Sequence, residues 1–279
     1  MKKHKRKSEW FDNEEIWRET FPFMFPADRI ASADDTVKKA LSLAKVKGKS
    51  VLDLCCGPGR CSVALSRRGL SVTGVDRTRY LLDKARTRAR AAGVHIEWIR
   101  EDMRDFVRPE SYDLALSMFT SFGYFENRSE DENVLSNVFK SLRPGGVFLL
   151  EMMGMETLAK NYRPSFVDKL SDGSMLVDEH QVIDDWSRVR TDWTIIRKGR
   201  VPRKFTFHIN LYSGRELREK LERAGFDPVQ LYGNMNGDAY GPDAKRLIAV
   251  GRKPKGALSQ TGSSSKVRSR KEQASPHSR

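Results

Sequence analysis

Hydrophobic and polar positions between residues 50 and 152 predict strands that alternate with helices. Short apolar runs have the length and composition of buried strands, at residues 50–54, 71–75, 94–100, 112–117 and 147–152. Segments between them carry apolar residues at helical spacing, at 60–68, 78–92 and 131–141. This alternation predicts a parallel sheet with right-handed crossovers, in which a ligand lies beyond the carboxyl ends of the strands.

The pattern changes after residue 152. Residues 152–174 show no regular period, and the runs that follow predict antiparallel strands, at 176–184, 186–197 and 204–212. Ser213 and Glu216 begin a helix that Gly225 ends, and further strands are predicted at 226–232 and 246–252. The predicted fold class is α/β, a doubly wound and mostly parallel sheet with an antiparallel insert at about residues 154–212, after the fifth strand.

The run Val51–Arg60, V-L-D-L-C-C-G-P-G-R, carries the clearest functional signal. A short strand enters a glycine turn and then a helix, which lets the backbone approach a nucleotide-like ligand closely. Asp76 ends the next strand 17 residues after Gly59, where a carboxylate accepts hydrogen bonds from ribose hydroxyls. Ser62 stands at the third glycine position of a dinucleotide loop, and Asp53 suits an ammonium group but repels a diphosphate. These details favour an adenosyl ligand over a dinucleotide.

Several segments resemble, in order and spacing, the motifs of class I S-adenosylmethionine-dependent methyltransferases, and the resemblance covers about residues 49–253. They are D-L-C-C-G-P-G-R at 53–60, V-D at 75–76, E-D-M at 101–103, Y-D-L-A-L-S-M-F at 112–119 and L-R-P-G-G-V-F-L-L at 142–150. The resemblance implies a Rossmann-like fold with a reversed final strand and S-adenosylmethionine as cofactor. It also implies the cofactor-binding residues: Asp53, Cys55, Gly57, Pro58, Gly59, Asp76, Arg77, Asp102, Met103, Ser117 and Met118.

Methyl transfer from a sulfonium is an in-line displacement, so the protein mainly aligns the nucleophile and excludes water. The segment 117–125, S-M-F-T-S-F-G-Y-F, lacks the D/N-P-P-Y/F motif of many methyltransferases that act on base amines. This difference argues against base-amine methylation. The aromatic residues of the segment have two interpretations that stay open here, a pocket lining and ordinary core.

The candidate catalytic residues are Tyr124, His208 and Glu151. His208 is either a base that points into the cleft or a hydrogen-bonded histidine of the insert. Glu151 either holds a substrate amine or is an ordinary acid at a strand end. Asp184 and Asp185 are expected on opposite faces of a strand, so no metal site is predicted.

The N-terminal segment is rich in aromatic residues. A short helix is predicted at 13–20 and another at 36–45, with Pro22 and Pro26 expected to break regular structure between them. In related methyltransferases a leading helix often folds over the cofactor, and Trp10, Phe11 and Trp17 suit such a lid because it must exclude water. Packing against the sheet edge is the alternative. The predicted organisation is a basic segment and helical lid at 1–48, a methyltransferase domain at 49–253 and a disordered basic tail at 254–279.

Charge is concentrated at the two ends of the chain. The net charge is +14, of which residues 2–7 contribute +5 and residues 252–279 contribute +7, leaving +2 for residues 8–251. Solvated tails explain this pattern, and weak nucleic-acid contact is the alternative. Cys55, Cys56 and Cys61 form no disulfide framework and no zinc motif, and no apolar run is long enough to span a membrane. A cytoplasmic location is therefore expected, and the sequence does not indicate an oligomeric state.

These features together predict methyl transfer from S-adenosylmethionine to a nitrogen or oxygen of a small organic substrate. The alternatives are an RNA methyltransferase that captures its substrate with the basic tails, and a non-catalytic cofactor-binding partner protein. The nearly neutral body counts against the first, and the intact glycine loop counts against the second.

Overall fold

The centre of the molecule is a mostly parallel sheet, seen in a computed structural model that describes residues 9–256. The sheet has seven strands within these residues, in the order β10-β11-β5-β4-β1-β2-β3. Their bounds are Ser50–Leu54 (β1), Ser71–Asp76 (β2), Glu97–Arg100 (β3), Tyr112–Ser117 (β4), Leu142–Met152 (β5), Val229–Tyr232 (β10) and Leu247–Arg252 (β11). The α/β fold class is confirmed. The basic residues 2–7 and most of the predicted tail lie outside the described residues.

The strand pairing creates a place for a ligand. Strand β1 pairs in parallel with both β2 and β4, and β11 pairs antiparallel with β5, so the final strand is reversed as the resemblance implied. The chain builds outward from β1 through β2 to β3 and then returns to place β4 on the other side of β1. The order of the strands reverses between β1 and β4, and open α/β sheets bind ligands at such a point.

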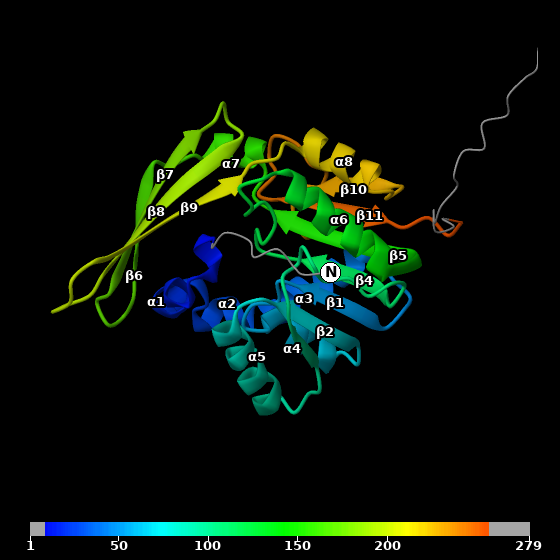
Figure 1. Cartoon of the computed structure of the whole chain (residues 1–279), viewed down its shortest axis with the longest axis horizontal. Helices are drawn as coiled ribbons and strands as arrows, with labels where there is room; N and C mark the ends of the chain where they lie inside the picture. The colour runs from blue at the N-terminus through cyan, green and yellow to red at the C-terminus, as the bar shows by residue number, and fades with distance from the viewer. Residues whose placement is uncertain (1–8, 257–279) are drawn as a thin grey trace, which may run out of the picture.

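Helices cover both faces of the sheet (Figure 1). On one face, α3 (Ala33–Ala44) and α4 (Arg60–Arg67) bury Val37 and Leu65 in one apolar cluster. On the other face, α6 (Ser129–Ser141) and α8 (Gly214–Arg223) bury Val134 and Leu217 in a second cluster. Helix α5 (Arg79–Ala91) follows β2. The apolar residues at helical spacing therefore form the buried faces of these helices.

The insert after β5 contains more regular structure than the sequence predicts. Residues 152–174, expected to be irregular, include helix α7 (Met155–Asn161) and strand β6 (Ser165–Lys169). Strand β6 is exposed along its whole length, so it has no apolar alternation to reveal it, and it forms by pairing with β7 (Met175–Ile183). Strands β6, β7, β8 (Arg188–Ile196) and β9 (Arg203–Asn210) make a four-stranded antiparallel sheet, as far as the described part of the chain extends.

Two further expectations about local structure were wrong. Asp184 and Asp185 do not lie on opposite faces of a strand, because both have left-handed backbone angles (φ 51° and 52°) in the turn between β7 and β8. Pro22 does not break the first helix, since α1 runs from Glu14 to Met24 with Pro22 inside it. Ile16, Trp17, Thr20 and Phe23 are buried along one side of this helix, and their packing holds it in spite of the missing N–H of proline.

The N-terminal elements lie between the two sheets (Figure 1). The short helix η1 (Trp10–Asp12) and α1 precede α2 (Ala27–Ala31), which Pro26 begins. Phe23 of α1 packs against Leu176 and Ile195 of the insert sheet. Within residues 9–256, no helix is long and apolar enough to cross a membrane.

Candidate functional site

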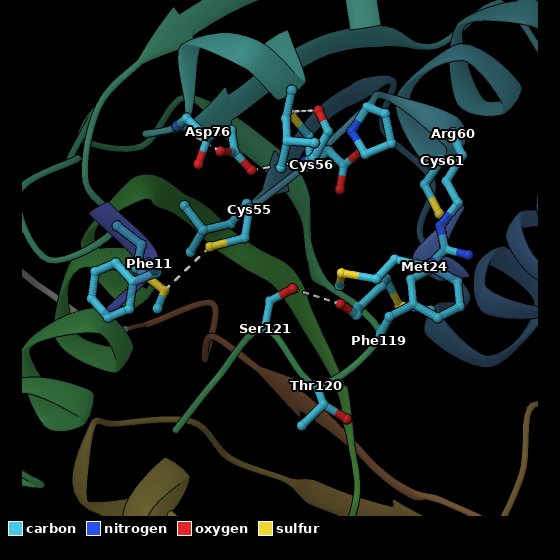
Figure 2. A pocket seen from close by; sticks show the side chains of 18 of the residues that line it. Phe11, Met24, Cys55, Cys56, Arg60, Cys61, Asp76, Phe119, Thr120 and Ser121 are labelled. Carbon is cyan, nitrogen blue, oxygen red and sulfur yellow. Dashed lines mark hydrogen bonds between the residues drawn. The ribbon is translucent and has the colours of Figure 1, made fainter. Parts of the chain in front are cut away.

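A cavity of about 660 Å³ opens at the carboxyl ends of β1, β2 and β4 (Figure 2). Asp76 lies at one side of it and Arg60 with Phe119 at the other. Most of the predicted site residues line this cavity: Asp53, Cys55, Gly57, Pro58, Asp76, Arg77, Asp102, Met103, Met118, Tyr124 and Glu151. Gly59, Ser117 and His208 do not line it.

Asp76 ties the glycine turn to the end of β2. One of its carboxylate oxygens accepts a hydrogen bond from the N–H of Gly57 (2.9 Å), and the other accepts one from the N–H of Thr78 (2.8 Å). Burial raises the pKa of Asp76, and these two N–H donors act in the opposite direction. Each oxygen keeps a further lone pair, so the carboxylate can also accept from hydroxyl groups of a ligand.

Gly59 serves packing rather than ligand contact. It begins α4 with φ 74°, and a Cβ at this position would lie 2.7 Å from the ring of Trp98 and 2.9 Å from the Cβ of Ala85. Only glycine fits both this backbone angle and this space. The second glycine of the turn therefore lets α4 and α5 approach each other beneath the cavity.

Asp53 is buried at the end of β1 and is held by Ser62. The Ser62 hydroxyl donates to the Asp53 carboxylate, and burial raises the pKa of Asp53 to about 6. Ser62, which stands at the third glycine position of the loop, therefore positions Asp53 toward the cavity. The sequence motif did not reveal this role of Ser62. Burial also raises the pKa of Cys55, which contacts Met103 (Sγ to Sδ, 3.4 Å), so its thiol stays neutral.

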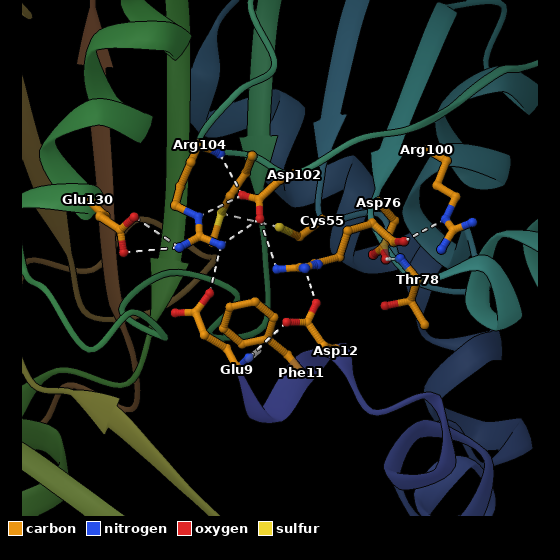
Figure 3. Close-up of polar contacts among 12 residues, drawn as sticks. Glu9, Phe11, Asp12, Cys55, Asp76, Thr78, Arg100, Asp102, Arg104 and Glu130 are labelled. Atoms are coloured by element: carbon orange, nitrogen blue, oxygen red, sulfur yellow. Dashed lines mark hydrogen bonds and ion pairs between the residues drawn. The ribbon is translucent and has the colours of Figure 1, made fainter. Parts of the chain in front are cut away.

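A buried arginine organises the edge of the cavity at Asp102 (Figure 3). The side chain of Arg104 is 2% exposed and forms ion pairs with Asp102 and Glu9, each at 2.7 Å. It also donates to both carboxylate oxygens of Glu130, each at 3.0 Å. These partners come from three separate parts of the chain, so the guanidinium joins the N-terminal segment to the sheet. Sequence reasoning missed Arg104, although it follows Asp102 by two residues.

The same network fixes Phe11 over the cavity (Figure 3). Arg77 pairs with Asp102 (2.9 Å) and with Asp12 of η1. The ring of Phe11 lies 4.6 Å from the guanidinium carbon of Arg77 and 5.8 Å from that of Arg104. Two cations that contact one ring, with acids on both sides, hold η1 against this end of the cavity.

The cavity wall beside Phe11 is aromatic. Trp17, Tyr124 and Trp193 line it, and Trp10 lies behind them, 4.9 Å from Tyr124 and 5.7 Å from Trp17 between ring centroids. Phe207 of the insert stacks on Trp10 at 4.6 Å. Burial raises the pKa of Tyr124, so its hydroxyl stays protonated near neutral pH.

The two interpretations of the aromatic segment both hold, for different residues. Phe119, Tyr124 and Phe125 line the cavity, whereas Phe122 is fully buried in the core and packs against Tyr212. The N-terminal aromatic residues likewise serve both purposes. Phe11 and Trp17 line the cavity and are also part of the main core cluster.

Comparisons with known proteins agree on one class of enzyme. A family model described as a methyltransferase domain matches residues 51–146. The chain is similar to the dTDP-3-amino-3,4,6-trideoxy-alpha-D-glucopyranose N,N-dimethyltransferase of Streptomyces venezuelae, with 26% identity over 68% of this chain and 81% of that protein. It is similar to the ubiquinone biosynthesis O-methyltransferase of Actinobacillus pleuropneumoniae, with 32% identity over 36% of this chain and 44% of that protein.

Solved structures share the fold. An S-adenosylmethionine-dependent methyltransferase from Clostridium acetobutylicum superposes with a TM-score of 0.71 at 15% identity, over 86% of this chain and 98% of that one. DesVI of Streptomyces venezuelae gives a TM-score of 0.62 at 22% identity, over 89% and 100%. The chain is a class I S-adenosylmethionine-dependent methyltransferase. Its cofactor is S-adenosylmethionine.

The fold of the methyltransferase does not bring His208 to the cavity. His208 is paired with Arg190 across β9 and β8. Its neighbour Phe207 faces Trp10, and successive strand residues face opposite sides. Burial and the nearby guanidinium groups of Arg188 and Arg190 lower the pKa of His208. His208 therefore lies on the outer face of the insert sheet, away from the reacting end of the cavity.

Two other predicted residues have roles that differ from the expectation. Ser117 is buried within the sheet at the end of β4 and does not reach the cavity. Glu151 reaches it, but its two carboxylate oxygens accept from Arg246 and from the N–H of Phe119. Its carboxylate is therefore neutralised within the protein.

Arg29 and Arg60 line the cavity near Asp53, and sequence reasoning assigned neither of them to the site. The guanidinium carbon of Arg60 lies 3.3 Å from the ring centroid of Phe119, and burial lowers the pKa of Arg60. Arg29, at the end of α2, donates weakly to the carbonyl of Met24 (3.5 Å). The acid and the two cations give this part of the cavity both signs of charge.

Proposed function

We propose that this methyltransferase transfers a methyl group to a nitrogen or oxygen atom of a small organic molecule by in-line displacement. The observation that carries the proposal is the shape of one cavity. It joins the carboxylate of Asp76 to an aromatic pocket at Tyr124 and is lined also by Phe11 of η1 and Trp193 of the insert. A pocket of this kind suits a small molecule, which it can surround and separate from water.

The charges along the cavity suit the parts of S-adenosylmethionine. Asp76 accepts from the ribose hydroxyls, and Asp102 and Met103 line the adenine side. Asp53 faces the ammonium group of the amino-acid part, and Arg29 and Arg60 face its carboxylate, since opposite charges attract strongly where water is excluded. A bound ammonium group also favours the ionised form of Asp53, whose pKa of about 6 is otherwise raised by burial.

The protein's contribution to the reaction is alignment and exclusion of water. S-adenosylmethionine supplies an already activated methyl group when it is bound. Tyr124, Trp17 and Trp193 enclose the acceptor, and their faces stabilise positive charge that develops on an acceptor nitrogen. Tyr124 remains protonated, so it orients an acceptor as a hydrogen-bond donor and does not serve as a base.

The test is a search for methylated products. Purified enzyme receives S-adenosylmethionine with an isotope-labelled methyl group and the small-molecule fraction of a cell lysate, and mass spectrometry follows the label. We expect label in a small molecule with wild type and at least tenfold less with Asp76→Ala. Label found only in RNA would favour an RNA methyltransferase. Label in no fraction, with S-adenosylhomocysteine binding intact, would favour a non-catalytic protein.

A further inference from the structure

The chain takes an unusual backbone conformation where β4 leaves the sheet. Phe119 and Thr120 are consecutive residues with φ 62° and 59°, in the left-handed region that side chains with a Cβ rarely occupy. Both residues and the following Ser121 line the cavity (Figure 2). Such strain persists only where the surroundings hold it, and it is concentrated at functional sites.

Two charged residues hold this turn. The N–H of Phe119 donates to the carboxylate of Glu151, and the N–H of Thr120 donates to the backbone carbonyl of the same residue (3.1 Å). Arg246 donates to the other carboxylate oxygen of Glu151 and to the hydroxyl oxygen of Thr120 (2.6 Å). The Glu151 side chain is 5% exposed, so these charge-assisted bonds form largely out of water.

The held turn links two parts of the cavity wall. It presents the ring of Phe119 to Arg60, which is the first residue of α4 after the glycine turn. It also begins the segment that leads to Tyr124. A change in the turn would therefore alter how the acceptor is placed relative to the cofactor.

We propose that Arg246 and Glu151 are positioning residues for methyl transfer, which hold the Phe119–Thr120 turn in its left-handed form and so align the acceptor with the cofactor. The location of the acceptor rests on the proposed function. The ion pair neutralises both charges while it binds the turn, and neither residue needs to contact the reacting atoms.

The first measurement needs no acceptor. Hydrogen exchange followed by mass spectrometry on the peptide 117–125 compares wild type with Arg246→Met, Arg246→Lys and Arg143→Met. Arg143 is a matched control. It lies on β5, the strand that carries Glu151, and it pairs with Asp113 of β4 at 3.0 Å, away from the cavity. We expect the amides of Phe119 and Thr120 to exchange at least tenfold faster in Arg246→Met, less so in Arg246→Lys, and unchanged in Arg143→Met.

The second measurement separates alignment from binding. With the acceptor identified by the labelling screen, Arg246→Met should lower kcat at least tenfold and change the affinity for S-adenosylhomocysteine by less than about threefold. Asparagine adopts left-handed angles more readily than other residues with a side chain. Thr120→Asn in the Arg246→Met background should therefore recover part of the lost kcat, whereas Thr120→Ala in that background should not.

Several results would overturn the inference. Unchanged exchange in Arg246→Met would show that the pair does not hold the turn, and faster exchange with full kcat would show that the turn does not align the reaction. Equal losses of kcat, affinity and melting temperature would indicate a purely structural role. If wild type labels no small molecule, the proposed function fails, while the exchange experiment still decides whether Glu151 and Arg246 hold the turn.

Discussion

Replacing Arg104 by methionine should strongly destabilise the methyltransferase. The Arg104 side chain is 2% exposed, and its carboxylate partners Asp102, Glu9 and Glu130 are 13%, 17% and 22% exposed. Methionine fills much of the same volume but removes the cation that these three acids share. Removing one partner of a buried ion pair costs about 3–5 kcal/mol. At about 2–4 °C of melting temperature per kcal/mol for a domain of this size, we expect a loss of roughly 6–20 °C.

The assay is a thermal melt and a urea titration, each with and without S-adenosylhomocysteine. Arg108→Met is the matched control, because Arg108 pairs with Glu97 at the surface, where the two side chains are 39% and 49% exposed. An exposed pair contributes about 0–1 kcal/mol. Arg104→Lys keeps the charge but cannot reach three carboxylates at once, so its loss should lie between those of the other two variants.

The ligand dependence tests whether the network also closes the site. Arg104 joins Glu9 of the N-terminal segment to Asp102 at the cavity edge, so S-adenosylhomocysteine should dissociate faster from Arg104→Lys than from wild type. Tryptophan fluorescence can follow this, because Trp17 lines the cavity and Trp10 packs against Trp17. Equal stability losses in Arg104→Met and Arg108→Met would refute the reasoning, since burial would then have no effect on the energy of the pair.

Three other predictions concern single positions. Asp76→Ala should weaken S-adenosylhomocysteine binding about ten- to a hundredfold, because it loses charge-assisted hydrogen bonds worth about 1.5–3 kcal/mol. Calorimetric titration measures this affinity, and unchanged affinity in a folded variant would remove Asp76 from the site. Gly59→Ala should lower the free energy of unfolding, measured in urea, by roughly 2–4 kcal/mol. The control Gly69→Ala should lower it less, because Gly69 has a similar φ of 78° but no atoms close to the added Cβ. Equal losses in the two variants would rule out the packing argument. Burial raises the pKa of Asp131 to about 6, so folding favours its protonated form and wild type loses stability as the pH rises from about 4 through 6. Asp131→Asn should remove up to roughly 3 kcal/mol of this pH dependence, and parallel stability curves for the two proteins would contradict it.

The sequence alone determined the parallel sheet and the cofactor end of the site. Strands β1 and β4 have the predicted bounds, because strands buried on both faces must be continuous apolar runs. The glycine turn and Asp76 were found because their chemistry depends on backbone angles and on strand ends, which local sequence encodes. Contacts within a strand–turn–helix unit are short in sequence, so they leave a readable pattern.

Only the tertiary structure decided which charged residues work together. Arg246 and Glu151 are 95 residues apart, as are Arg104 and Glu9, and no periodicity relates such partners. Strand β6 likewise has no apolar pattern of its own and exists through its pairing with β7.

The face of β9 that carries His208 depended on where the N-terminal segment packs. Alternation along a strand fixes which residues share a face, but it does not say which face is covered. Phe207 is covered by Trp10, so His208 faces outward. The residue predicted as a base therefore lies outside the cavity. Local sequence thus specified the backbone that holds the cofactor, while long-range packing chose the side chains at the end where the acceptor binds.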